Sequence, residues 1–144
     1  MKISEKTRSK IQKYSQTIFC CLAWILLISI VIQASLASLA IFVDASFWKN
    51  HLAFIKVLEY IPALMYIIGS AGEVPQKYKA WSFMLFILCN IQYYTDRGWM
   101  GVIHMVSAFF IFMISLYVAW GSYQYLFKHK KEVVNGYDDL YKNM

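Results

Sequence analysis

The chain is poor in charged residues. Only 15% of its 144 residues are Asp, Glu, Lys or Arg, and 60% are hydrophobic. A soluble domain has about 25% charged and about 45–50% apolar residues. Four apolar segments of about 20 residues, each long enough to cross the hydrocarbon core of a bilayer, would use most of this chain. The composition therefore excludes an ordinary soluble domain and indicates a small polytopic membrane protein with no separate extramembrane domain.

Sequence signatures of catalysis and metal binding are also missing. The three cysteines, Cys20, Cys21 and Cys89, lie in apolar segments without CxxC spacing, so we interpret them as small apolar side chains rather than metal ligands or disulfide partners. The chain has no glycine-rich phosphate loop, no Ser/His/Asp order and no paired carboxylates at one depth. Such motifs supply phosphate binding, nucleophiles and acid–base groups. We therefore expect no enzymatic action on a soluble substrate.

Four apolar segments predict an all-α fold, namely an antiparallel four-helix transmembrane bundle in the cell membrane. The predicted spans are about 17–43, 48–70, 78–95 and 99–126. The basic start and the first apolar segment also resemble a signal peptide, but this segment is too long for the apolar region of such a peptide. Pro62, in the second span, predicts a kink there.

The distribution of basic residues predicts that both termini are cytoplasmic, because cytoplasmic loops carry the excess of Lys and Arg. All but three of the 14 basic residues lie in the two terminal segments or at Lys77 and Lys79, beside the cytoplasmic start of the third span; the exceptions are Lys49, Lys56 and Arg97. Topology and attraction to anionic lipids account for these charges. We therefore expect no nucleic-acid partner, and expect the bilayer together with a membrane-protein partner or a second copy of the chain.

Each predicted span carries a polar side chain that is costly in hydrocarbon unless it faces the bundle interior, so these residues indicate a functional region. His51 and His104 lie within the second and fourth spans, a few residues from the outer end of each. Gln33 and Gln92 lie in the outer halves of the first and third spans. The four helices thus each contribute one polar group to the outer half of one bundle.

Helical periodicity supports this convergence, because His104 shares a narrow face with small and polar residues (Ser107, Ala108, Ile111, Ser115 and Ser122). Two histidines at matched depth suit a b-type haem, with one imidazole on each face of the iron. Gln33 and Gln92 would then orient the imidazoles or bind a propionate, and Arg97 at the outer mouth would pair with a propionate. The alternatives are that the site holds another ligand or ion, or that the histidines are purely structural.

Lys56 and Glu59 form the one charged pair inside a predicted span. They are three residues apart, so they can meet on the helix surface as an intramembrane ion pair near mid-depth. Either this pair neutralises itself, or Lys56 extends its charge toward the membrane surface. A further alternative is that Glu59, with Lys56, forms an ion or proton pathway.

The segment QASLASLAIF at 33–42, then His51, Gln92 and the Val-Ile-His sequence ending at His104 resemble a family of small bacterial four-helix membrane proteins of unknown function. That family is distantly similar to cytochrome b-type bundles, so the resemblance implies haem or quinone chemistry at the same Gln and His positions. Lys56 and Glu59 depart from the plain apolar second helix of the family. The sequence thus leaves two functions open: a haem-binding electron carrier or sensor, and a non-enzymatic accessory subunit of a larger membrane complex.

Overall fold

The structure is a computed structural model that describes residues 4–142, with side chains described up to Lys128. Lys2 and the side chains of Lys130, Lys131 and Lys142, all counted in the predicted topology, lie outside this description. The described residues form five α-helices and no strand: α1 (Glu5–Phe42), α2 (Phe47–Leu58), α3 (Tyr60–Ala71), α4 (Gln76–Gln92) and α5 (Met100–Lys142). The all-α class predicted from the sequence is confirmed.

Helix α1 begins well before the predicted first span, because polar contacts hold its basic N-terminal part against the turn between α3 and α4. The Arg8 guanidinium pairs with the Glu73 carboxylate at 2.7 Å, and Gln12 donates to the same carboxylate. One turn further, the buried Gln16 side chain donates to the Gly72 carbonyl at 2.9 Å. Glu5 in the first turn is also favourable, since a negative charge stabilises a helix N-terminus.

The predicted second span is helical over Phe47–Ala71, with a one-residue interruption at Glu59, between α2 and α3. Pro62 is the physical reason. Proline has no N–H to donate to the carbonyl of Leu58, four residues earlier, and its ring crowds that carbonyl. Pro62 is also fully buried. The distortion therefore appears one turn before the proline itself.

The third and fourth predicted spans also have different boundaries in the structure. Helix α4 ends at Gln92, because the next three N–H groups, of Tyr93, Tyr94 and Thr95, donate to carbonyls three residues earlier instead of four. This tighter turn ends the helix before the predicted residue 95. Helix α5 begins at Met100 and continues to Lys142, far beyond the predicted end at 126.

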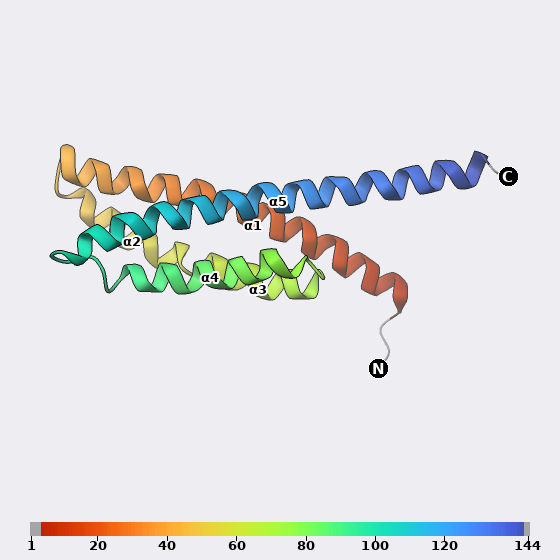
Figure 1. Cartoon of the computed structure of the whole chain (residues 1–144), viewed down its shortest axis with the longest axis horizontal. Coiled ribbons are helices and arrows are strands. Elements are labelled where there is room, and N and C mark those ends of the chain that lie inside the picture. The colour runs from red at the N-terminus through yellow and green to blue at the C-terminus, as the bar shows by residue number, and fades with distance from the viewer. Residues whose placement is uncertain (1–3, 143–144) are drawn as a thin grey trace.

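The helices form a ring in which α1 contacts α2, α3 and α5, and α4 contacts α3 and α5. In the described chain α1 does not pack on α4, and neither α2 nor α3 packs on α5. The segment α2–α3 and helix α5 therefore lie diagonally across the ring (Figure 1). The connections 43–46 and 93–99 lie at the same end of the molecule, which we call the loop end, whereas α5 projects beyond the opposite end.

The core runs along the middle of this ring and contains fully buried side chains from four helices (Phe19, Leu26, Met65, Leu85 and Val118). On α5, Ile111, Ser115 and Ser122 of the predicted small and polar face are buried, whereas Ala108 of the same face is exposed. Cys20 and Cys89 are buried, whereas Cys21 is exposed on the outside of α1. Small interior residues let helices approach closely.

Three helical segments are long and apolar enough to cross a membrane: Glu5–Phe42, Phe47–Ala71 and Met100–Lys128. Their outward faces are rich in exposed apolar side chains, including Ile28, Val102 and Met105. An exposed apolar surface of this extent is unfavourable in water but normal against lipid. The molecule therefore has the character of a membrane protein.

Candidate functional site

Gln33 and His51 form a closed pair of hydrogen bonds between α1 and α2. The Gln33 amide donates from Nε2 to the His51 carbonyl at 3.0 Å. In return, His51 Nδ1 lies 3.1 Å from the Gln33 carbonyl oxygen. Because a carbonyl oxygen only accepts, Nδ1 must carry the ring proton. The second ring nitrogen, Nε2, of the neutral His51 imidazole is consequently a free lone pair, the form in which histidine binds a metal.

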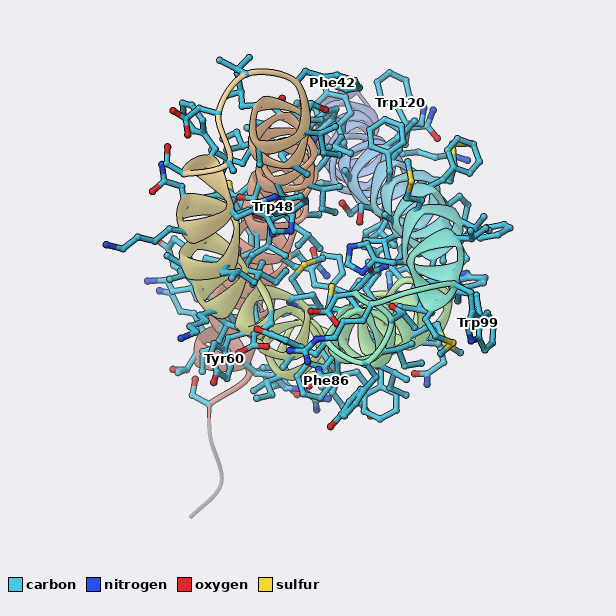
Figure 2. The ribbon with its side chains drawn as sticks, turned by 90° about the vertical axis from the view of Figure 1, so that its left-hand side faces the viewer. Phe42, Trp48, Tyr60, Phe86, Trp99 and Trp120 are labelled. Atoms are coloured by element: carbon cyan, nitrogen blue, oxygen red, sulfur yellow. The ribbon has the colours of Figure 1, made fainter. Side chains whose placement is uncertain are left out.

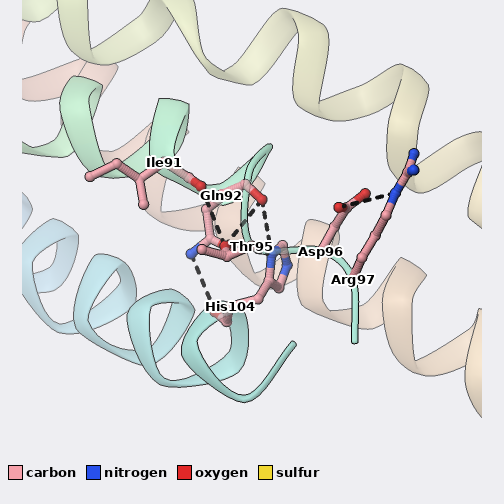
Figure 3. A network of polar contacts seen from close by, with 6 residues as sticks. All are labelled: Ile91, Gln92, Thr95, Asp96, Arg97 and His104. Carbon is pink, nitrogen blue, oxygen red and sulfur yellow. Dashed lines mark hydrogen bonds and ion pairs between the residues drawn. The ribbon is translucent and has the colours of Figure 1, made fainter. Parts of the chain in front are cut away.

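Gln92 and His104 repeat this arrangement between α4 and α5. Gln92 Nε2 lies 3.3 Å from the His104 carbonyl and 2.8 Å from the Ser107 hydroxyl. His104 Nδ1 lies 3.2 Å from the Gln92 carbonyl and 3.5 Å from the Thr95 hydroxyl. Figure 3 shows how the turn after α4 brings Thr95 and the Gln92 carbonyl beside the imidazole. His104 is therefore also held as the Nδ1–H tautomer.

The two pairs have equivalent positions in the fold. Each joins the end of one helix to the start of the next at the loop end, so each closes one helical hairpin, α1–α2 or α4–α5. His51 and His104 belong to diagonal helices. Both are half-buried. The structure thus pairs each of the two histidines with one of the two glutamines that the sequence singled out, as two Gln–His half-sites.

The amide oxygens of both glutamines are buried and have no hydrogen-bond donor in the described part of the chain. The orientation of each amide is fixed chemically, because Nε2 must face the histidine carbonyl, which cannot donate. Leaving a buried acceptor unpaired costs about 1–3 kcal/mol. The half-sites therefore offer two imidazole lone pairs and two unpaired amide oxygens, all of which are electron-pair donors.

Arg97 does not join this site, contrary to the sequence prediction. Its guanidinium lies 3.6 Å from the Asp96 carboxylate, and its side chain is 93% exposed. Figure 3 shows the side chain extending away from His104. The physical reason is that residues 93–99 form a loop beyond the end of α4, where Arg97 can stay in water beside an opposite charge.

The predicted ion pair between Lys56 and Glu59 is wrong, since no such pair is present within residues 4–128. Lys56 is exposed on α2. Glu59 is half-buried at the helix break, where its carboxylate interacts with the Tyr93 hydroxyl at the end of α4. Although side chains three residues apart can meet on a helix, these two differ in their surroundings, since Lys56 is exposed and Glu59 is half-buried. The proposed role of the two residues in an ion or proton pathway stays a prediction.

Sequence reasoning missed Thr95 and Trp48 as neighbours of the two imidazoles. Thr95 contacts His104, and the Trp48 ring lies edge-on to His51 with 5.5 Å between the ring centroids. Trp48 lies three residues before His51 in the sequence. Its helical spacing of three was the one available signal, because side chains three residues apart are neighbours on a helix. In the described residues, no group of three or more His, Cys, Asp or Glu side chains is placed to hold a metal ion.

Comparison with known proteins gives one match, to a family model described as a family of unknown function, DUF6220, over residues 33–96. The match begins at Gln33, contains His51 and Gln92, and ends before His104. No curated protein and no solved structure matches the chain significantly. Over less than half of its length, the chain is thus similar to a family of unknown function, in keeping with the resemblance noted from the sequence.

Proposed function

We propose that the protein binds a b-type haem at the loop end, with His51 and His104 as the axial ligands. The observation that carries this proposal is the pair of Gln–His half-sites, which hold both imidazoles as neutral Nδ1–H tautomers with free Nε2 lone pairs. Hydrogen bonding of the second ring nitrogen to a carbonyl is the usual way in which a metal-binding histidine is oriented. The diagonal positions of α2 and α5 support a cofactor that would be held between the two histidines.

The chemistry of the site favours haem over a quinone. A quinone presents two carbonyl oxygens, which need hydrogen-bond donors. The Gln–His pairs themselves offer acceptors, namely the two Nε2 lone pairs and the two unpaired amide oxygens of Gln33 and Gln92. A metal centre with two open axial positions accepts electron pairs from imidazoles. The donor set therefore fits a metalloporphyrin.

In this function the chain positions, insulates and tunes the cofactor. When bound, haem supplies one-electron redox chemistry. His51 and His104 supply the axial ligands, while the carbonyls of Gln33 and Gln92 increase the basicity of the imidazoles by accepting their Nδ1 protons. The apolar residues around the half-sites lower the local dielectric constant. These features support electron transfer or haem sensing, and no residue is assigned a catalytic role.

The membrane arrangement that accompanies this function is an antiparallel four-helix transmembrane bundle with both termini in the cytoplasm and the loop end outside. This proposal adds α4 to the three segments that are long and apolar enough to cross a membrane, as the third span along the chain. Its 17 residues give a length of about 25 Å, slightly less than the hydrocarbon core of about 30 Å. Reporter fusions after residues 45 and 97 should score as external, and fusions after 74 and 142 as cytoplasmic.

Absorption spectroscopy of the protein purified from membranes tests the haem proposal. The wild-type protein, as isolated or after titration with haemin, should show a Soret band and, when reduced, the sharp α-band of a six-coordinate b-type haem. The variants His51→Ala and His104→Ala should lose this spectrum. His129→Ala, the change of the third histidine, is the matched control and should bind haem as the wild type does.

A wild-type protein that neither contains haem nor binds added haemin would overturn the proposal. So would retention of the six-coordinate spectrum in both His51→Ala and His104→Ala. In the absence of haem, the better proposal would be an accessory subunit, which predicts a membrane protein that copurifies in fixed stoichiometry.

A second candidate, a proton or ion pathway, is favoured by the position of Glu59. A carboxylate at a break in a membrane helix is a typical arrangement of ion and proton sites, because broken helices leave backbone groups free to bind ions. In liposomes with an imposed pH gradient, wild-type protein should then conduct protons and Glu59→Gln should not. Equal flux through both proteins would eliminate this candidate.

A further inference from the structure

Trp48 connects the His51 imidazole to the surface of the loop end. The two rings are nearly perpendicular, with an interplanar angle of 87° and 5.5 Å between centroids. The Trp48 residue is 41% exposed. Figure 2 views the molecule from the loop end and shows Trp48 inside the ring of helices, whereas Trp99 points outward. One aromatic side chain therefore reaches from the candidate axial ligand to this end of the molecule.

The second half-site has no equivalent of Trp48. The residue three positions before His104 is Gly101, and a Cβ added there would have no atom of the structure within 4 Å. Within residues 4–128, no aromatic ring contacts the His104 imidazole, whose side-chain neighbour is the Thr95 hydroxyl. The two half-sites thus share their Gln–His hydrogen bonds. They differ at the residue three positions before the histidine, which is Trp48 in one and Gly101 in the other.

We propose that Trp48 is the path by which electrons pass between a soluble one-electron carrier at the loop end and a haem held by His51 and His104. This inference rests on the proposed haem site. In the step, one electron leaves the reduced carrier and converts ferric to ferrous iron, and no bond is formed or broken and no proton moves. The polarisable indole of Trp48 lies directly against the His51 imidazole. It therefore shortens the distance that an electron must cross between the carrier and the haem without the help of an aromatic ring.

Stopped-flow reduction of the haem-loaded protein by hexaammineruthenium(II) in detergent tests the path. Trp48→Leu should slow reduction several-fold, while the Soret band and the midpoint potential stay as in the wild type. Trp99→Leu is the matched control: Trp99 is 75% exposed at the same end but faces away from the ring, so this variant should react at the wild-type rate. The double variant Trp48→Leu/Gly101→Trp should recover the lost rate through His104.

A second measurement, independent of the reduction rate, is quenching of tryptophan fluorescence during haemin titration. Because Trp48 is adjacent to the site, Trp48→Leu should remove more of the quenched signal than Trp99→Leu. A haem-loaded Trp48→Leu variant that is reduced as fast as the wild type would overturn the inference and leave the haem site intact. Failure of the wild type to bind haem would instead overturn the proposed function, and the electron path with it.

Discussion

Gln33 and His51 are 18 positions apart in sequence, yet each side chain bonds to the backbone carbonyl of the other. Gln92 and His104 make the same exchange across 12 positions. Each reciprocal pair joins two consecutive helices through one side chain and one backbone carbonyl from each. It also fixes the tautomer of a histidine without any charged group. The helical hairpins at the loop end are therefore each held by a Gln–His pair instead of an ion pair.

Removal of one reciprocal bond should destabilise the protein even without a ligand. Gln33→Leu removes the amide donor to the His51 carbonyl, which keeps its helical N–H partner in α2, and we expect a loss of about 0.5–1.5 kcal/mol in the free energy of unfolding. Unfolding in mixed detergent micelles measures this loss. Gln124→Leu, an exposed glutamine on α5, is the control and should change stability by less than about 0.5 kcal/mol. Equal stability of the two variants would contradict the importance of this hydrogen bond.

Gly121 should not tolerate even a methyl group. An added Cβ would lie 2.5 Å from Tyr78 Cε1 and 2.6 Å from its hydroxyl, and Tyr78 is itself buried and packed against Tyr117. Since the ring cannot move freely, Gly121→Ala should be about 1–3 kcal/mol less stable than Gly101→Ala in thermal unfolding. Gly101→Ala is the matched control on the same helix, where the added methyl meets open space. A Gly121→Ala variant as stable as this control would show that the α4–α5 contact is looser.

Lys56 and Glu59 should behave as independent residues. With no ion pair between them, a double-mutant cycle of Lys56→Met and Glu59→Gln should give a coupling energy below about 0.5 kcal/mol. The single change at Glu59 should have the larger effect, because Glu59 is half-buried and Lys56 is exposed. The cycle is measured by unfolding in mixed micelles. A coupling energy well above that limit would contradict this prediction and support the ion pair that helical spacing suggested.

Asp44, in the connection between α1 and α2, should titrate at an unusually low pH. The Ser46 backbone N–H donates to its carboxylate at 2.7 Å, and this bond holds the pKa of Asp44 below its usual value. A lowered folded-state pKa means that the hydrogen bond stabilises the turn above the usual Asp pKa of about 3.9, and that this contribution disappears as the pH falls through the lowered pKa.

Carboxyl-carbon NMR titration measures the pKa of Asp44. Ser46→Pro removes the N–H donor at a residue whose φ of −60° already suits proline. The pKa of Asp44 should rise toward the usual value in this variant. An unchanged titration would show that Ser46 is not the cause.

Much of the fold could be predicted because it depends on local features of the chain. Apolar runs identified the helical class, and Pro62 identified the region in which the second helix is interrupted. The position of the break at Glu59 and the length of α1 were missed. The first depends on how α2 and α3 pack on α1, and the second on contacts of Arg8 and Gln16 with a turn far along the chain. Periodicity contains no information on such distant contacts.

The sequence singled out the four polar residues of the candidate site, but it did not predict the hydrogen bonds between them. Gln33, His51, Gln92 and His104 were identified by their cost in an apolar environment. Their pairing, the tautomers and the unpaired amide oxygens were not accessible from spacing. The predicted position of Arg97 in the site was wrong. A charged side chain on a loop can reach either a ligand site or water, and the conformation of the loop decides which of the two it reaches.

The sequence by itself determined that this is a helical, strongly apolar protein with polar groups gathered near two of its connections. These properties follow from composition and from the cost of polar atoms in hydrocarbon. Only the tertiary structure decided that each glutamine bonds to one histidine, that the two histidines lie on diagonal helices, and that Trp48 has no counterpart at Gly101. The physical reason is that these relationships require a particular rotation and vertical offset of each helix relative to its neighbours. The packing of all the helices in the ring sets both quantities.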